Sequence, residues 1–175
     1  MRDPVIEKVI ADYKFENVQH WATIFARVLV GFLEENADLF KRFDLIVASP
    51  SYVARDADVR NWDHTRRVIE LAHTESRGEW PFDVGRDLKA IIKTAATPKM
   101  SKQPTWKARD AIARGPLRKA LKIPDPQRTK GKAVLVYDDV FTDGHTLNEV
   151  ALCLRLQGKA KEVCGVSLAR QPWKR

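Results

Sequence analysis

Apolar residues in the first third of the chain recur every three or four positions, which is the spacing of an amphipathic helix. One face of this helix carries Val18, Trp21, Phe25, Val28, Leu29 and Phe32. Asn17, just before them, is a suitable N-cap. The run Leu-Ile-Val-Ala at residues 45–48 stops at a Ser-Pro pair and is typical of a buried parallel strand.

A second helix is predicted from about residue 63 to residue 74, with Gly78 as its stop, and a second strand at residues 88–92. The last third of the chain has the clearest pattern. Residues 133–137 predict a buried strand, residues 146–157 a helix, and residues 162–168 a further strand. Together they predict a right-handed βαβ unit with parallel strands.

Repeated alternation of strands and helices predicts an α/β fold, with an open, mainly parallel sheet and helices on both faces. Residues 94–129 interrupt this pattern with five prolines, many cations and weak periodicity. They predict a mobile segment with one or two short helices. Long segments of this kind are often functional lids or disordered.

The length of 175 residues fits one domain, which we expect to span residues 1–175, with a helical region at about 1–43. No apolar run approaches the roughly 20 residues of a membrane helix, and no signal segment is evident at the N-terminus. We therefore expect a cytoplasmic protein without a membrane partner. Cys153 and Cys164 lack the spacing of a zinc or redox site and are expected to be buried thiols.

The net charge of +8 favours a polyanionic partner, either nucleic acid or a phosphorylated small molecule. Cations are densest at residues 89–132, where Trp106 is the only aromatic residue. A platform for single-stranded nucleic acid usually interleaves several aromatic rings with its cations. The charge pattern therefore leaves both kinds of partner open.

The most informative segment is residues 134–146, which reads Val-Leu-Val-Tyr-Asp-Asp-Val-Phe-Thr-Asp-Gly-His-Thr. Ligands of open α/β sheets bind at the carboxyl ends of the strands, where Asp138 and Asp139 fall. The following loop opens a helix, whose N-terminal N–H groups and dipole favour an anion such as phosphate. Carboxylates beside it can accept hydrogen bonds from sugar hydroxyls or hold a metal. These properties favour a ribose 5-phosphate group, although acid pairs also occur in receiver domains and other magnesium phosphotransfer folds.

This segment resembles the phosphoribosyl pyrophosphate (PRPP) motif of type I phosphoribosyltransferases: apolar strand, two acids, then a Thr-x-Gly-x-Thr loop. From about residue 13 to residue 170 the chain resembles the ComF-like group, with residues 61–72 similar to its middle motif and residues 163–170 to its closing strand. The chain departs from that group in three respects. The N-terminal four-cysteine zinc module is absent, the Gly and Asn of the middle motif are not matched, and Asp143 stands where Thr is common.

The resemblance implies that Asp138 and Asp139 hold the ribose hydroxyls as the catalytic acids, and that Asp139 contacts a Mg²⁺ cofactor through water. It implies that the 5-phosphate is held by Thr142, Asp143, Gly144, His145 and Thr146. A carboxylate would repel the phosphate unless a cation intervenes or the side chain turns away. We expect the Asp143 side chain to turn outward and the His145 side chain to face solvent, so that both bind through their backbone.

The resemblance also implies a pyrophosphate loop at Ser49, Pro50 and Ser51. Arg55 or Arg60 could supply charge there. In the same way, Lys99, Lys102 and Arg109 are candidate lid cations for the pyrophosphate. The alternatives are an ordinary strand-ending turn and solvated charges. Trp173 is expected either to stack on the acceptor base or to pack on the surface as a tail aromatic.

The first functional hypothesis is a Mg²⁺-dependent phosphoribosyltransferase that joins a nucleobase-like acceptor to PRPP and releases pyrophosphate. The alternative is a non-catalytic PRPP or nucleotide sensor, or a competence-associated accessory protein, on the same fold. The resemblance leaves a homodimer open, and nucleic acid remains an open partner.

Overall fold

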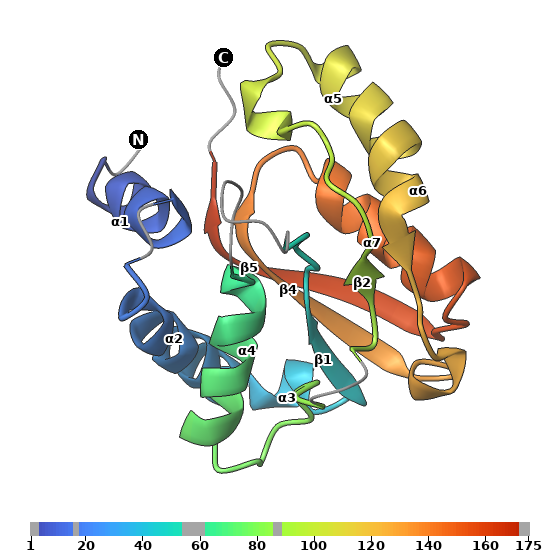
Figure 1. Ribbon diagram of the computed structural model, residues 1–175. Coiled ribbons are helices and arrows are strands. Elements are labelled where there is room, and N and C mark those ends of the chain that lie inside the picture. The colour runs from blue at the N-terminus through green and yellow to red at the C-terminus, as the bar shows by residue number, and fades with distance from the viewer. Residues whose placement is uncertain (1–3, 16–17, 54–61, 86–88, 172–175) are drawn as a thin grey trace.

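A three-stranded parallel sheet forms the centre of the computed structural model, which describes residues 4–15, 18–53, 62–85 and 89–171. The strand order is β1 (Leu45–Ala48), β4 (Ala133–Phe141), β5 (Glu162–Arg170) (Figure 1). Ala48 pairs with Tyr137, and Asp138 pairs with Ser167. A parallel bridge between Ile46 and Phe82 extends the sheet beyond β1. The predicted α/β class and the parallel sheet are thus confirmed.

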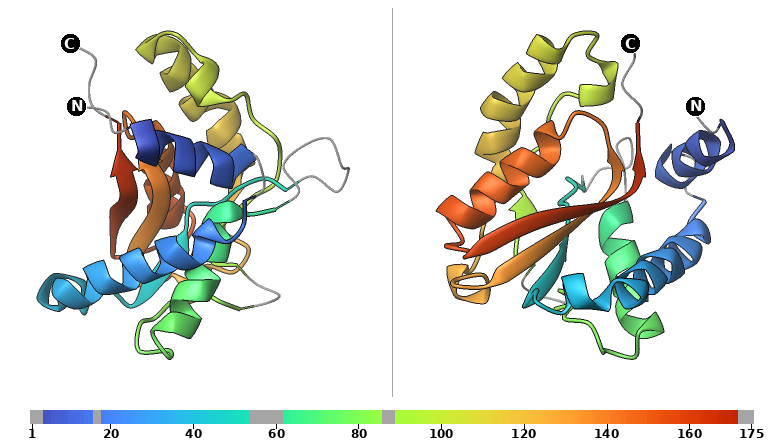
Figure 2. Two further views of the ribbon diagram at one scale, coloured as in Figure 1. Left: turned by 90° about the vertical axis from the view of Figure 1, so that its left-hand side faces the viewer. Right: turned by 180° about the vertical axis from the view of Figure 1, so that it is seen from behind.

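Helices cover both faces of this sheet (Figure 2). On one face, α1 (Pro4–Phe15), α2 (Trp21–Glu35), α3 (Ala37–Phe40) and α4 (His64–Glu75) pack against the side chains of Leu135 and Tyr137. On the other face, α7 (His145–Leu156) packs against Val134 and Val136. Two hydrophobic cores therefore sandwich the sheet, as the repeated strand-helix alternation predicts.

The predicted end of the central strand at residue 137 is wrong, because β4 continues to Phe141. Backbone pairing with β5 holds these extra residues, with Val140 opposite Ala169 and Phe141 opposite Arg170. Side chains of a strand point alternately to its two faces. Asp138 and Asp139 therefore leave the strand in opposite directions.

Other element boundaries agree in part. The helix α4 begins as predicted, and the side chain of Asp63 caps it by accepting the Arg66 N–H at 3.2 Å. The helix α2 begins at Trp21, later than expected, and the proposed cap Asn17 lies outside the described residues. The bounds of the strand expected at residues 88–92 are wrong, because the strand β2 is Ile92–Lys93, where it pairs antiparallel with β3 (Leu121–Lys122).

The proline-rich segment contains more helix than the sequence predicts. After the 3₁₀ turn η1 (Met100–Lys102), the chain is helical through α5 (Trp106–Ile112), the π-helical turn η2 (Ala113–Leu117) and α6 (Arg118–Ala120). A further 3₁₀ turn, η3 (Pro126–Arg128), follows. The π turn accommodates Pro116, and the Arg118 guanidinium donates to both carboxylate oxygens of Glu149 on α7, at 2.6 and 2.8 Å. These tertiary contacts stabilise a helix whose sequence pattern is weak.

A buried carboxylate joins three parts of the fold. Asp83 is 3% exposed and accepts the Arg128 guanidinium at 2.6 Å and the backbone N–H of Ala90 at 2.9 Å. Nη1 of Arg66, on α4, lies 3.5 Å from Oδ2 of Asp83, and Nη2 of Arg66 donates to the Gly85 carbonyl at 2.9 Å. Asp83 thus neutralises two partly or fully buried arginines.

Both cysteines are free thiols, and the expected burial is confirmed for Cys153 but wrong for Cys164. Cys153 is buried in the α7 core, and burial raises the pKa of its thiol to about 11, whereas Cys164 is half-buried. Within the described ranges, no helix has the length and apolar character needed to cross a bilayer.

Candidate functional site

The loop between β4 and α7, at residues 142–146, lies at the carboxyl edge of the sheet and is the candidate anion-binding site; we call it the anion seat. Gly144 immediately precedes α7 in a left-handed conformation with φ of 78°. A small cavity of about 20 Å³ lies beside it, lined by Asp138, Val140, Phe141, Thr142, Gly144, Thr146 and Leu147. The structure therefore brings Asp138 together with both threonines of the loop at the N-terminus of a twelve-residue helix.

Gly144 is expected to be essential for the shape of this loop. A Cβ at Gly144 would lie 3.1 Å from the Phe141 ring, whereas one at Gly131 (φ 73°) would meet nothing within 4 Å. We expect Gly131→Ala to cost about 1–2 kcal/mol of stability through its positive φ. Gly144→Ala should cost roughly 1 kcal/mol more, because it also crowds Phe141. Equal losses for the two variants in urea denaturation would contradict the role of the Phe141 contact.

The two acids of the motif have different surroundings. Asp138 faces the cavity, and its Oδ1 accepts the backbone N–H of Asp139 at 3.0 Å. Asp139 points toward α4, where its Oδ2 lies 2.8 Å from Nε2 of His64. The side chains of His64 and Asp139 are each only 5% exposed. The structure does not bring the two carboxylates together on one face of the strand.

Two tyrosines surround the His64–Asp139 pair. The Tyr13 hydroxyl donates to the His64 carbonyl at 2.6 Å, and its ring packs edge-on against Trp62. Tyr137 is buried on the same face of β4 as Asp139. Burial, and then the Asp139 carboxylate, raise the pKa of both phenols. This part of the site is a packed interior, and we identify no sequence pattern that singles out His64.

The loop after β1 lies beside Tyr137 and Asp138. The backbone N–H of Ser49 donates to the Tyr137 carbonyl at 2.7 Å, and the Ser49 carbonyl accepts a hydrogen bond from the Thr65 hydroxyl at 2.7 Å. Ser49 uses its amide in the sheet and Pro50 has none. Of the three predicted residues this leaves the amide of Ser51, and the pyrophosphate role of the loop stays a prediction. Arg55 and Arg60 lie outside the described residues, so their predicted role stays a prediction.

Part of the proline-rich segment packs directly on the anion seat. The Arg109 guanidinium donates through Nε to Asp143 Oδ2 at 2.6 Å. The Trp106 and His145 rings lie 5.1 Å apart, and the Thr146 hydroxyl contacts the Met100 sulfur at 3.9 Å. Met100 and Trp106 are site residues that the sequence did not indicate.

Two predicted side-chain orientations are wrong. Asp143 does not turn to solvent, since its side chain is 11% exposed and pairs with Arg109. Burial acts to raise the pKa of Asp143, but the hydrogen bond and charge of Arg109, with the charge of His145, outweigh it and lower the pKa. The His145 side chain is also buried, against Trp106 and 3.7 Å from Asp110. Docking of α5 on the loop causes both differences.

Two further predicted residues of the site are Lys102 and Trp173. Lys102 is exposed at the end of η1, two residues after Met100. Trp173 lies outside the part of the chain that the structure describes, so both of its predicted roles stay predictions.

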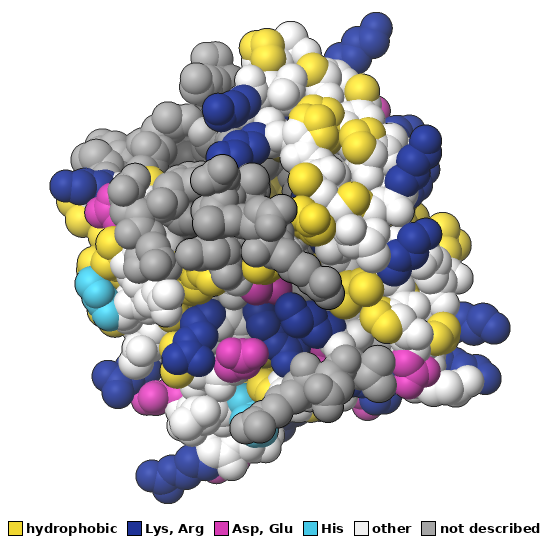
Figure 3. Space-filling view, viewed as in Figure 1, with side chains coloured by type: hydrophobic (Ala, Val, Ile, Leu, Met, Phe, Trp, Pro, Cys, Tyr) yellow, Lys and Arg dark blue, Asp and Glu magenta, His cyan; other side chains and the backbone are white. Residues whose placement is uncertain are grey.

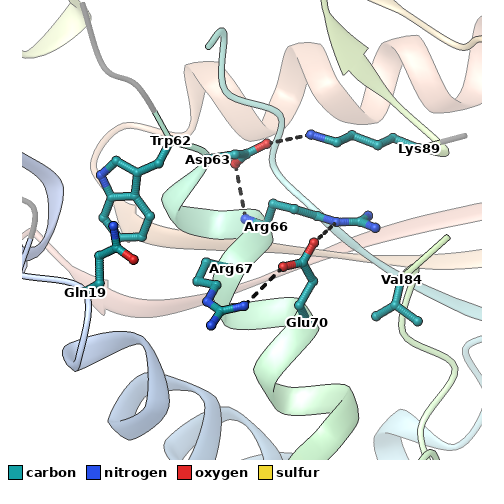
Figure 4. A pocket seen from close by; sticks show the side chains of 8 residues that line it. All are labelled: Gln19, Trp62, Asp63, Arg66, Arg67, Glu70, Val84 and Lys89. Atoms are coloured by element: carbon teal, nitrogen blue, oxygen red, sulfur yellow. Dashed lines mark hydrogen bonds and ion pairs between the residues drawn. The ribbon is translucent and has the colours of Figure 1, made fainter. Parts of the chain in front are cut away.

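A second, larger cavity of about 400 Å³ lies beside the N-terminal half of α4 (Figure 4). Lys89 pairs with Asp63 at 3.1 Å, and Arg66 and Arg67 pair with Glu70 at 3.1 and 3.7 Å. The charges in its wall thus largely neutralise one another. Trp62 and Gln19 complete the opposite side.

The surroundings of Asp139 do not fit a hydrated Mg²⁺ ion. Its carboxylate is buried and held against His64, which leaves no room for the water shell that Mg²⁺ usually keeps. Nowhere in the described ranges do three His, Cys, Asp or Glu side chains gather as possible metal ligands. We therefore assign no step to a metal ion held by Asp139.

Comparison with known proteins adds no assignment to this geometry. No protein-family model matches the chain, and no curated protein matches it. The geometry by itself defines an α/β protein with a small polar cavity at the carboxyl edge of its parallel sheet, beside the N-terminus of α7.

Proposed function

We propose that this chain binds PRPP and transfers its phosphoribosyl group to a nitrogenous acceptor, with release of pyrophosphate. The observation that carries the proposal is the convergence of Asp138, Thr142, Gly144 and Thr146 at the start of α7. A helix N-terminus with threonine hydroxyls suits a phosphate, and a neighbouring carboxylate suits sugar hydroxyls. The parallel sheet with helices on both faces is compatible with the type I phosphoribosyltransferase fold.

In this proposal the 5-phosphate lies on the loop and the first N–H groups of α7. Asp138 accepts hydrogen bonds from the ribose, and Ser51 lies toward the pyrophosphate. Asp139, paired with His64, acts by holding the end of β4 against α4. The ribose contact is therefore assigned to Asp138 alone.

The chemistry proposed is substitution at C1 of the ribose. The acceptor nitrogen forms a bond to C1 while the bond from C1 to the pyrophosphate oxygen breaks, and pyrophosphate leaves with the electron pair. The chain contributes positioning and electrostatic stabilisation. The Mg²⁺ that the resemblance implies would reach the site bound to the pyrophosphate of the substrate.

Calorimetry with PRPP and magnesium, together with pyrophosphate release over a panel of nucleobases, tests this proposal. Binding of PRPP and of ribose 5-phosphate is expected, with turnover for at least one base. PRPP affinity without turnover on any base would favour a sensor on the same fold. Failure of the protein to bind either ligand would overturn the proposal.

A charged surface favours a second candidate, a regulator or accessory protein that also binds nucleic acid. Residues 99–132 hold eleven of the 31 Lys and Arg but only two of the 23 Asp and Glu, so this segment has a net charge of +9 and the rest −1. Lys and Arg side chains line the edge of the molecule over α5 and α6 (Figure 3), and Trp106 is 53% exposed there. Binding of single-stranded DNA that weakens steeply with salt would support this candidate.

A further inference from the structure

The anion seat contains an acid that should oppose its proposed ligand. Asp143 stands between Thr142 and Gly144, and the Thr142 hydroxyl donates to its Oδ1 at 3.2 Å. A carboxylate this close to a bound phosphate dianion would weaken binding, since charges a few ångströms apart interact strongly in a partly buried site. The loop can hold a phosphate well only if this charge is compensated.

Arg109 supplies a compensating charge from a different element. Its Nε donates to Asp143 Oδ2 at 2.6 Å, a short charge-assisted hydrogen bond. Its Nη1 donates to the Gln103 carbonyl at 3.0 Å, so the guanidinium is held at two points. The side chains are 27% and 11% exposed, so water screens the pair only in part.

The helix that carries Arg109 is fixed on the loop by further contacts. The Thr105 side chain caps α5 by accepting the Ala108 N–H at 3.1 Å. Trp106, at the first position of α5, packs on the His145 ring. The guanidinium therefore reaches Asp143 from a preorganised helix rather than from a solvated side chain.

We propose that Arg109 is a positioning residue that neutralises Asp143 and thereby makes the loop at residues 142–146 able to accept a phosphate dianion. The inference rests on the proposed function, because it names a residue that allows the proposed phosphate site to bind its ligand. It differs from the expectation that Arg109 is a lid cation for pyrophosphate. Arg109 acts through Asp143, so its importance depends on the charge of Asp143.

A double-mutant cycle separates indirect from direct action. The affinity for ribose 5-phosphate is measured by calorimetry for the wild type, Arg109→Gln, Asp143→Asn and the double variant. Arg109→Gln is expected to weaken binding about tenfold, equivalent to about 1.4 kcal/mol. In the Asp143→Asn background the same change should cost less than about threefold, because the charge that it compensates is gone. Arg109→Lys should retain most of the affinity.

An equal loss from Arg109→Gln in both backgrounds would show a direct contact with the ligand and overturn the inference. Unchanged affinity on Arg109→Gln in both backgrounds would also overturn the inference. Arg114→Gln is the matched control, since it removes the same charge from the same helical run, where Arg114 is 65% exposed and pairs with Asp110. A tenfold loss in that control would attribute the effect to net charge and also overturn the inference.

Hydrogen exchange distinguishes this failure from failure of the proposed function. Arg109→Gln and Asp143→Asn are each expected to speed amide exchange in α5, with or without ligand. Unchanged exchange in both variants would overturn the Arg109–Asp143 pairing even if no ligand binds. A wild-type protein that binds neither ribose 5-phosphate nor PRPP, with exchange faster in both variants, would overturn only the proposed function.

Discussion

Asp83→Ala is expected to lower the free energy of unfolding by about 3–5 kcal/mol, the usual cost of leaving a buried charge without its partner. Arg128, at 2.6 Å, would lose its carboxylate partner. Arg66, 8% exposed in its side chain, would keep Glu70 and the Gly85 carbonyl as its partners among the described residues. The backbone N–H of Ala90 would also lose its acceptor. Since domains of this size are stable by only about 5–15 kcal/mol, a large share of the stability would be lost.

Urea denaturation followed by circular dichroism measures this loss. Glu75→Ala is the matched control, because it removes the acid of an exposed pair with Arg27 at 3.0 Å, which should be worth at most about 1 kcal/mol. Asp83→Asn keeps the shape of the side chain but not its charge, and should fall between the two. If Asp83→Ala costs no more than Glu75→Ala, Asp83 does not organise these elements.

Substitution of the two neighbouring acids of the motif is expected to have different effects: loss of the first carboxylate lowers ligand affinity, and loss of the second lowers stability. Asp138→Asn should weaken PRPP binding roughly 10- to 100-fold, since hydrogen bonds to charged groups are worth about 1.5–3 kcal/mol. The side chain lies at the edge of the cavity, so the fold should tolerate this change. Asp139→Asn should instead lower stability by roughly 1–3 kcal/mol, because its carboxylate is buried against His64.

Calorimetry with PRPP and urea denaturation, performed on the same preparations, check this separation. Asp125→Asn provides the control for loss of one negative charge outside the site, at the residue before η3, where the Asp125 side chain caps the turn by accepting a hydrogen bond from the Gln127 N–H at 2.9 Å. If Asp139→Asn weakens PRPP binding as much as Asp138→Asn while stability is unchanged, both acids hold the sugar. That outcome would restore the assignment that the sequence alone suggests.

Local patterns predicted the elements that local forces dominate. The four apolar residues of β1, the strand start at Ala133 and the helix α7 all appear where periodicity placed them. Long-range contacts decided the exceptions. Pairing with β5 extends β4 to Phe141. The hydrogen-bonded ion pair between Arg118 and Glu149 stabilises the helical run in the proline-containing segment.

The sequence by itself determined the α/β class and the positions of Asp138, Thr142, Gly144 and Thr146 in one strand-loop-helix unit, because hydrophobic period and glycine conformation act over a few residues. Only the tertiary structure decided which acid faces the seat, that His64, 75 positions earlier, meets Asp139, and that Arg109 meets Asp143. Those contacts join distant segments through packing against the sheet, and no local pattern records which distant side chains will meet.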